Sequence, residues 1–182
     1  MLFEMRDIRT ERLLLRKLTM RDAADIYAYS CDPEVARHVL WDAHASLAES
    51  KGYLRYMLRK YRLGEPSSWG IEHLESGRII GTIGYMWYQR ENSAVEVGYS
   101  LSRRYWNQGL MTEALAAVLD HSFHTLRLHR VEAQHETANP ASGAVMIKSG
   151  MTKEGVLRGR LYNKGRFVDV ALYAILREDY IK

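Results

Sequence analysis

One stretch near the middle of the chain combines a strand pattern, a polar loop and a helix in an order suited to anion binding. Apolar and polar residues alternate over 94–101, which is typical of a strand with two different faces. A basic and polar loop follows, and from Gly109 apolar residues recur at helical spacing. The first turn of a helix has N–H groups without internal partners, and Gly109 has no side chain to hinder a ligand. The segment therefore predicts an anion site at a helix N-terminus.

The elements around this segment follow from capping and turn signals. We expect Thr19 to cap a helix that carries Asp22 in its first turn, and Asn139 to cap another that begins at Pro140. Further helices are predicted from Pro33, from Ser46 to Gly64, and from Gly109 to about Leu126. Strands are predicted at 10–18, 68–73, 78–88, 94–101, 130–135, 156–162 and 167–176.

This order of elements predicts an α/β protein with a central mixed sheet flanked by helices. Helix connections imply parallel pairing in the middle of the sheet, and hairpins imply antiparallel pairing on either side. The length suits one domain over residues 1–182, because no linker, repeat or low-complexity segment divides the chain.

Composition excludes several classes of function. A net charge of +4, spread along the chain, argues against nucleic-acid binding, and no apolar run is long enough to cross a membrane. The single cysteine, Cys31, excludes an internal disulfide and favours the cytoplasm; we expect it to be a small buried residue. Four histidines form no metal-ligand pattern, so no metal is predicted and surface or capping roles are expected for His121, His124, His129 and His135.

Two motifs together resemble the Gcn5-related N-acetyltransferases (GNAT). Residues 106–111 read Trp-Asn-Gln-Gly-Leu-Met, in which Gly109 matches the central glycine of that family's pyrophosphate loop. Residues 139–151 resemble its second motif, with Asn139, Ser142, Lys148 and Gly150 in place. Residues 10–16 and 112–114 are similar to the branch that acetylates the N-termini of ribosomal proteins, so the resemblance covers nearly the whole chain.

The resemblance implies acetyl-CoA as cofactor and a sheet that splays beside the strand carrying Glu96. Backbone groups of Tyr99 and Leu101 would pair with pantetheine, and the loop N–H groups would bind pyrophosphate. Ser142 would lie towards the sulfur. The cofactor-binding residues expected in this way are Tyr99, Leu101, Trp106, Asn107, Gln108, Gly109, Leu110, Met111, Thr112, Asn139 and Ser142.

Two side chains are candidates for proton transfer. Glu96 lies on the strand that leads into the loop, where a carboxylate could deprotonate an acceptor amine; alternatively it faces solvent or pairs with an arginine. Many family members have a tyrosine acid where this chain has Met146, which cannot donate a proton. Ser142 is the nearest substitute, unless its hydroxyl caps its own helix turn.

The predicted function is direct acetyl transfer from acetyl-CoA to a primary amine. The resemblance favours the N-terminal α-amine of a protein such as a ribosomal protein. Alternatives are a small amine such as a polyamine, amino sugar or antibiotic, and, because of Met146, a module that binds acyl-CoA without turnover. We expect the acceptor pocket to arise from loops such as 36–50 and 89–93, and a homodimer is possible.

Overall fold

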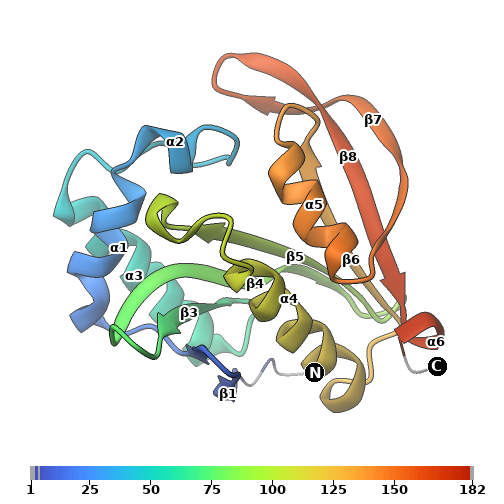
Figure 1. The fold of residues 1–182 in the computed structure, drawn as a ribbon, viewed down its shortest axis with the longest axis horizontal. Coiled ribbons are helices and arrows are strands. Elements are labelled where there is room, and N and C mark those ends of the chain that lie inside the picture. Colours follow the sequence, from blue (N-terminus) through green and yellow to red (C-terminus); the bar gives the residue numbers. More distant parts are fainter. Residues whose placement is uncertain (1–2, 4, 181–182) are drawn as a thin grey trace.

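The computed structural model of the protein describes residue 3 and residues 5–180. Its centre is an eight-stranded sheet in the order β1-β2-β3-β4-β5-β6-β8-β7, flanked by helices (Figure 1). The strands are β1 (Ile8–Arg9), β2 (Leu13–Arg16), β3 (Ser68–His73), β4 (Arg78–Gln89), β5 (Ala94–Leu101), β6 (Arg130–Glu136), β7 (Thr152–Asn163) and β8 (Arg166–Leu176). The helical segments are η1 (Met20–Asp22), α1 (Ala23–Ser30), α2 (Pro33–Ala36), α3 (Leu47–Leu63), η2 (Arg103–Tyr105), α4 (Leu110–Asp120), η3 (His121–Thr125), α5 (Pro140–Lys148) and α6 (Arg177–Tyr180). The predicted α/β class with a mixed sheet is confirmed.

Strand pairing follows the predicted connections in part: one helix connection gives the expected parallel pair and the other does not. β5 and β6, which are joined through α4, are parallel, and the other neighbouring strands are antiparallel. β6 and β7 are joined through α5, yet they are not neighbours, because β8 lies between them. The β7–β8 hairpin therefore forms one edge of the sheet, with β7 outermost.

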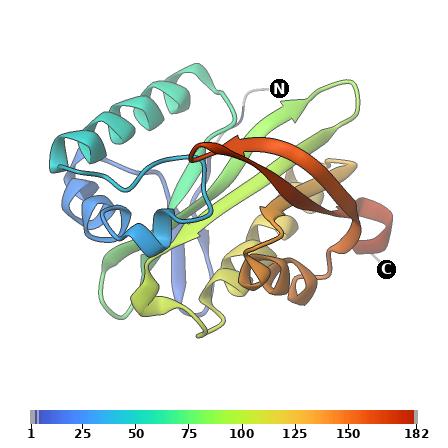
Figure 2. The same ribbon diagram turned by 90° about the horizontal axis from the view of Figure 1, so that it is seen from above.

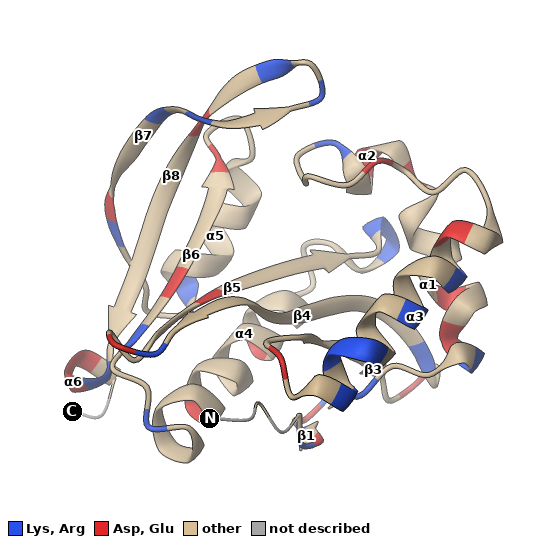
Figure 3. Ribbon diagram, turned by 180° about the vertical axis from the view of Figure 1, so that it is seen from behind, with Lys and Arg blue, Asp and Glu red and all other residues tan. Residues whose placement is uncertain are grey.

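Helices cover both faces of the sheet (Figures 1 and 3). The larger core lies on the face covered by α4 and α5, where Val95 and Val97 of β5 pack with Leu115 and Met146. A smaller core lies under α1 and α3 and includes Ile26, Leu54 and Ile79. Because side chains alternate along a strand, neighbouring residues of β5 project towards different helices. None of the helices within the described residues is long and apolar enough to cross a membrane.

The sheet opens between its two parallel strands. β5 pairs with β6 only from Ala94 to Glu96, opposite Arg130 to Glu132, although β5 continues to Leu101 and β6 to Glu136. Beyond Glu96 the facing edge of β5 carries backbone groups that β6 does not pair with. The opening expected beside the strand of Glu96 is therefore present.

Capping fixes the start of several helices. Thr19 and Asp22 form the reciprocal capping box that the sequence predicted, and the side chain of Asn139 accepts from the N–H of Ser142 at the start of α5. α3 ends at Gly64, which adopts the left-handed conformation expected of a C-terminal glycine. The helix predicted from Gly109 to Leu126 is an α-helix only to Asp120, and its last turn is the π-helical segment η3.

Two expectations about single residues are wrong. His121 lies in the protein interior, 8% exposed, with its ring edge-on to Trp69 at 5.7 Å between centroids. Burial lowers the pKa of His121, so its imidazole is uncharged, and the packing of this ring against Trp69 stabilises the buried position. Cys31 is half-exposed rather than buried, because it occupies the C-cap of α1, where the helix ends at the surface.

Candidate active site

A cavity of about 490 Å³ lies where the end of β5 meets the N-termini of α4 and α5. It brings together most of the residues expected to bind a cofactor, drawn from segments far apart in sequence. These are Tyr99, Leu101, Trp106, Asn107, Gly109, Met111, Thr112, Asn139 and Ser142. Gln108 and Leu110 are not in the cavity lining, and Leu110 is buried in the core. The lining also includes Glu34 of α2, His38 and Val39 of the loop after α2, and Lys148 at the end of α5, none of which was predicted to bind the cofactor.

The loop before α4 has the backbone shape of an anion site. Asn107 and Gly109 have φ angles of 59° and 76°, in the left-handed region. A Cβ added to Gly109 would meet only Arg12 Nη2, at 3.6 Å, so the space in front of this turn is open. The first N–H groups of α4 have no partner in the preceding turn and carry the positive end of the helix dipole. The residues present therefore fit a pyrophosphate group.

Side chains hold this loop in place. The indole Nε1 of Trp106 donates to the carbonyl oxygen of Leu101 at 2.8 Å. This carbonyl was expected to pair with pantetheine, and the bond from Trp106 occupies one of its two lone pairs. Arg12 Nη1 donates to the carbonyl of Gln108 at 2.9 Å, and Arg12 Nε donates to Glu113 at 2.7 Å. Burial alone would raise the pKa of Glu113, but bonds from Thr10 and Arg12 hold it below its usual value. The loop is thus tied to the β1–β2 segment.

Ser142 and Tyr99 form a pair in the cavity wall. The Ser142 hydroxyl donates to the Tyr99 hydroxyl at 3.1 Å, and the Tyr99 hydroxyl donates to the Ser142 carbonyl at 3.0 Å. Asn139 caps α5 by accepting from the Ser142 N–H, and the Ser142 hydroxyl bonds to Tyr99 instead of capping its own helix turn. Burial raises the pKa of Tyr99, which keeps this phenol protonated at neutral pH. Met146 is 1% exposed in the core and offers no proton.

Glu96 lies at the point where the sheet opens, on the opposite face of β5 from Tyr99. Its carboxylate accepts from Trp87 Nε1 at 2.6 Å and from Gln134 Nε2 at 3.1 Å. Burial raises the pKa of Glu96, and these hydrogen bonds and the charge of Arg160 offset only part of the effect. Both hydrogen-bond donors are neutral, so no ion pair fixes the carboxylate in its charged form. Glu96 therefore keeps its proton to a higher pH than an ordinary glutamate does.

The two carboxylates of β6, Glu132 and Glu136, have polar partners of their own. Glu132, opposite Glu96 on β6, lies 2.6 Å from Arg130 Nε. Glu136 is 4% exposed, accepts from Asn163 Nδ2 and lies 2.9 Å from His38 Nδ1. Burial favours a higher pKa at Glu136, but these contacts lower it. Of Glu96 and Glu136, Glu96 is therefore the one whose pKa is raised rather than held down by its partners.

The β7–β8 turn forms a roof over the open part of the sheet. Figure 2 shows this hairpin arching towards the loop that follows α2. There Lys164 Nζ donates to the carbonyls of Val39 and Trp41 at 2.7 and 3.1 Å. We call these contacts, together with the bonds from His38 and Asn163 to Glu136, the clasp. The clasp places part of the loop 36–50, where acceptor binding was predicted, beside the cofactor cavity.

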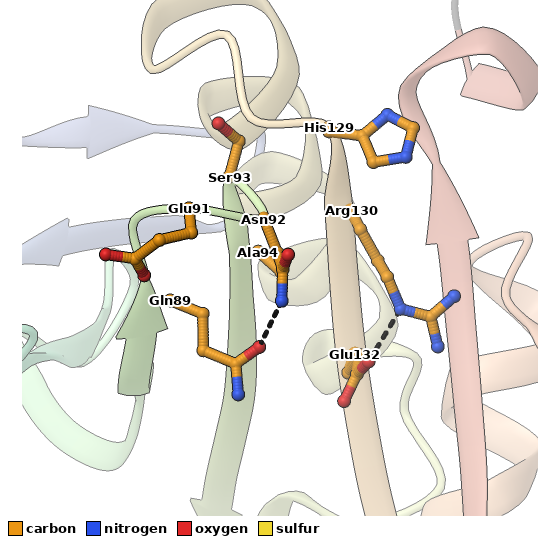
Figure 4. A pocket seen from close by; sticks show the side chains of 8 residues that line it. All are labelled: Gln89, Glu91, Asn92, Ser93, Ala94, His129, Arg130 and Glu132. Carbon is orange, nitrogen blue, oxygen red and sulfur yellow. Dashed lines mark hydrogen bonds and ion pairs between the residues drawn. The ribbon is translucent and has the colours of Figure 1, made fainter.

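A second hollow, of about 620 Å³, lies at the other end of β5 (Figure 4). The loop 89–93 borders it, together with His129, Arg130 and Glu132. Arg130 is paired with Glu132 and Glu154, so its charge is already neutralised. The hollow lies where β5 and β6 are paired, so no open edge of either strand faces it. It also lacks the helix N-termini that border the first cavity. No cluster of three or more His, Cys, Asp or Glu that could hold a metal occurs within residues 3 and 5–180.

Comparison with known proteins agrees with this geometry. Residues 12–152 match the acetyltransferase (GNAT) domain family. The chain belongs to the GNAT family. It is 31% identical over 176 residues to the N-acetyltransferase p20 of Bacillus licheniformis, covering 97% of this chain and 99% of that protein. It is 28% identical over 182 residues to the uS5-alanine N-acetyltransferase of Escherichia coli, covering 94% and 91%.

The solved structures show the same fold. The ribosomal-protein-S5-alanine acetyltransferase of Vibrio fischeri superposes with a TM-score of 0.84 at 25% identity, covering 97% of this chain and 99% of that one. Other GNAT structures with this fold contain coenzyme A or acetyl-CoA. The protein is therefore an acetyl-CoA-dependent N-acetyltransferase, as the sequence predicted.

Proposed function

We propose that this GNAT enzyme acetylates the N-terminal α-amine of a protein, such as a ribosomal protein. The observation that carries the proposal is the position of Glu96, at the opening of the sheet and bonded only to neutral donors. A single carboxylate base suits an acceptor that loses its proton easily. An α-amino group has a pKa of about 8 and a lysine side chain about 10.4, so the α-amine is free roughly a hundred times more often. The likeness to uS5-alanine acetyltransferases adds support.

Each part of the site has a role in this proposal. When bound, acetyl-CoA supplies an acetyl thioester. The loop around Gly109 and the first turn of α4 hold its pyrophosphate, and the open edge of β5 faces its pantetheine arm. Glu96 accepts a proton from the acceptor ammonium, directly or through one water. Ser142 Oγ, bonded to the Tyr99 hydroxyl, holds a proton at the cavity wall, where the thiol must leave.

The clasp also bears on the choice of acceptor. Lys164 connects the hairpin turn to the loop after α2, so the region beside the cavity is roofed rather than open. A roofed opening suits an extended chain end, which is narrow, better than the side of a folded domain. This supports a flexible protein N-terminus as the acceptor.

Paired peptides test the proposal. One peptide has a free α-amine and an acetylated lysine, and the other has a blocked N-terminus and a free lysine. At neutral pH we expect kcat/KM for the first to exceed that for the second by about a hundredfold or more, because far more of its amine is unprotonated. A polyamine serves as a third acceptor. Equal rates for the two peptides, or a clear preference for the polyamine, would overturn the proposal.

A further inference from the structure

The strand that roofs the opening contains a bulge with two arginines. Leu157 pairs with Val170 and Leu161 with Val168, so β7 advances four residues while β8 advances two. Arg158, Gly159 and Arg160 of β7 therefore lie opposite a single residue of β8, Asp169. A bulge of this kind re-aims side chains away from the regular alternation of a strand.

The bulge has a defined shape. Gly159 has a φ of 59°, in the left-handed region that other residues rarely adopt. Its N–H donates to Asp169 Oδ1 on β8 at 2.7 Å. This bond connects the bulge to the neighbouring strand, so the two flanking arginines project from a fixed backbone rather than from a flexible loop.

Both arginines lack a carboxylate partner in direct contact among the described residues. Each is exposed, and within the described part of the chain neither has a hydrogen bond or an ion pair. Arg12, Arg16 and Arg130, in contrast, each bind a carboxylate. Figure 3 shows several basic residues along the β7–β8 hairpin. In the sequence, Lys164 and Arg166 add two more at its turn.

One of the two arginines is electrostatically coupled to the proposed base. Arg160 acts on Glu96, opposing the rise in pKa that burial causes there. The ammonium that Glu96 deprotonates must lie beside Glu96, so the acceptor residues that follow this ammonium enter the field of the same arginine. Successive residues of an extended peptide are about 3.3 Å apart, which places the second and third side chains near the roof.

We propose that Arg160, assisted by Arg158, binds an acidic side chain of the acceptor, so that the preferred substrates are protein N-termini with Asp or Glu at the second or third residue. The proposal rests on the proposed function and specifies its substrate class. A guanidinium matches a carboxylate through two parallel hydrogen bonds, which gives direction as well as attraction. The same positive charge disfavours polycationic acceptors such as polyamines.

Three peptides that differ only at residues two and three test this assignment. They start with Ala and continue with Asp-Asp, Gln-Gln or Lys-Lys. At low ionic strength we expect wild-type kcat/KM to be about 10–100-fold higher for the acidic peptide than for the neutral one, the usual worth of hydrogen bonds to a charged group. Arg160→Gln should bring this ratio close to one. The ratio is insensitive to any change in Glu96, because such a change affects both peptides equally.

The matched control is Arg55→Gln, which removes an exposed arginine from α3 without altering the hairpin. It should keep the wild-type ratio. A wild-type enzyme that does not distinguish the acidic from the neutral peptide would overturn the proposal, and so would an Arg160→Gln variant that retains the full preference. Absence of α-amine acetylation on all three peptides would instead refute the proposed function.

Discussion

At the scale of single residues, Gly109 is a position where we expect a substitution to weaken cofactor binding. Its φ of 76° and the open space before it leave room for a ligand rather than for a side chain. Gly109→Glu should place a negative charge where pyrophosphate binds. We expect affinity for acetyl-CoA, measured by calorimetry, to fall by at least tenfold, equivalent to about 1.4 kcal/mol.

The control must separate strain from electrostatics. Gly77, in the turn between β3 and β4, has a φ of 64° and nothing within 4 Å of an added Cβ. Gly77→Glu should therefore incur a similar backbone cost, about 1–2 kcal/mol in the free energy of unfolding, with no loss of acetyl-CoA affinity. Equal affinity in Gly109→Glu and wild type would remove the loop from its assigned role.

The sequence predicted the roles of individual residues correctly where a role depends only on neighbours along the chain. Glycine at 109 and asparagine at 139 predicted a turn and a cap, because each depends on its own few neighbours. The partner of Ser142 could not be predicted, since Tyr99 is 43 residues away and approaches only through the fold. Likewise, nothing local to Glu96 indicates that Trp87 and Gln134 are its hydrogen-bond donors.

At the scale of elements, the clasp connects a hairpin to a loop more than a hundred residues away. Lys164→Met keeps the length of the side chain but removes the donor to Val39 and Trp41. Hydrogen bonds from a charged group are worth about 1.5–3 kcal/mol each, so the loop should open more often. We expect chymotrypsin to cleave after Trp41 at least several-fold faster in the variant, as followed by mass spectrometry.

Lys51→Met, at an exposed position of α3, controls for the loss of a surface charge and should keep the wild-type cleavage rate. If Lys164→Met and wild type are cleaved at the same rate, the contacts of Lys164 do not hold the loop. If both variants are cleaved faster to the same degree, the effect is one of charge and not of the clasp.

The elements themselves were largely predictable, but their order in the sheet was not. Capping by Thr19 and Asn139 and the hairpin turns are encoded within short segments, so helices and strands lie close to the predicted ranges. Insertion of β8 between β6 and β7 depends on long-range pairing that alternation along a strand does not specify. The π-helical turn at 121–125 was missed for a related reason, because its residues continue the apolar helical pattern.

At the scale of the whole molecule, the proposed function requires two substrates to approach one point, at the opening between β5 and β6. The cofactor cavity is bounded by α4 and α5. Glu96 lies on the other face of β5 from Tyr99, and Figure 2 shows the β7–β8 hairpin arching towards the loop after α2. Direct transfer needs both substrates bound together, and this arrangement allows it without a covalent acetyl-enzyme. The possible homodimer and the extent of the domain over residues 1–182 stay predictions.

The buried position of Glu96 also affects stability. Because the pKa of Glu96 is raised in the folded protein, the folded state holds this proton more tightly than the unfolded state does. Stability therefore falls as pH rises from the unfolded pKa through the folded one, and it remains lower above that window. Glu96→Gln removes this cost, so at neutral pH its free energy of unfolding should equal or exceed that of wild type.

The most direct test of the account is the pH profile of kcat/KM for Glu96→Gln beside wild type, with a peptide α-amine as acceptor. Wild-type kcat/KM should rise with pH through the raised pKa of Glu96, because the base acts only when ionised. At neutral pH the variant should be slower by about 10²–10⁴-fold, with acetyl-CoA affinity unchanged, and higher pH should restore part of the rate. A Glu96→Gln variant with wild-type kcat/KM at neutral pH would contradict the account.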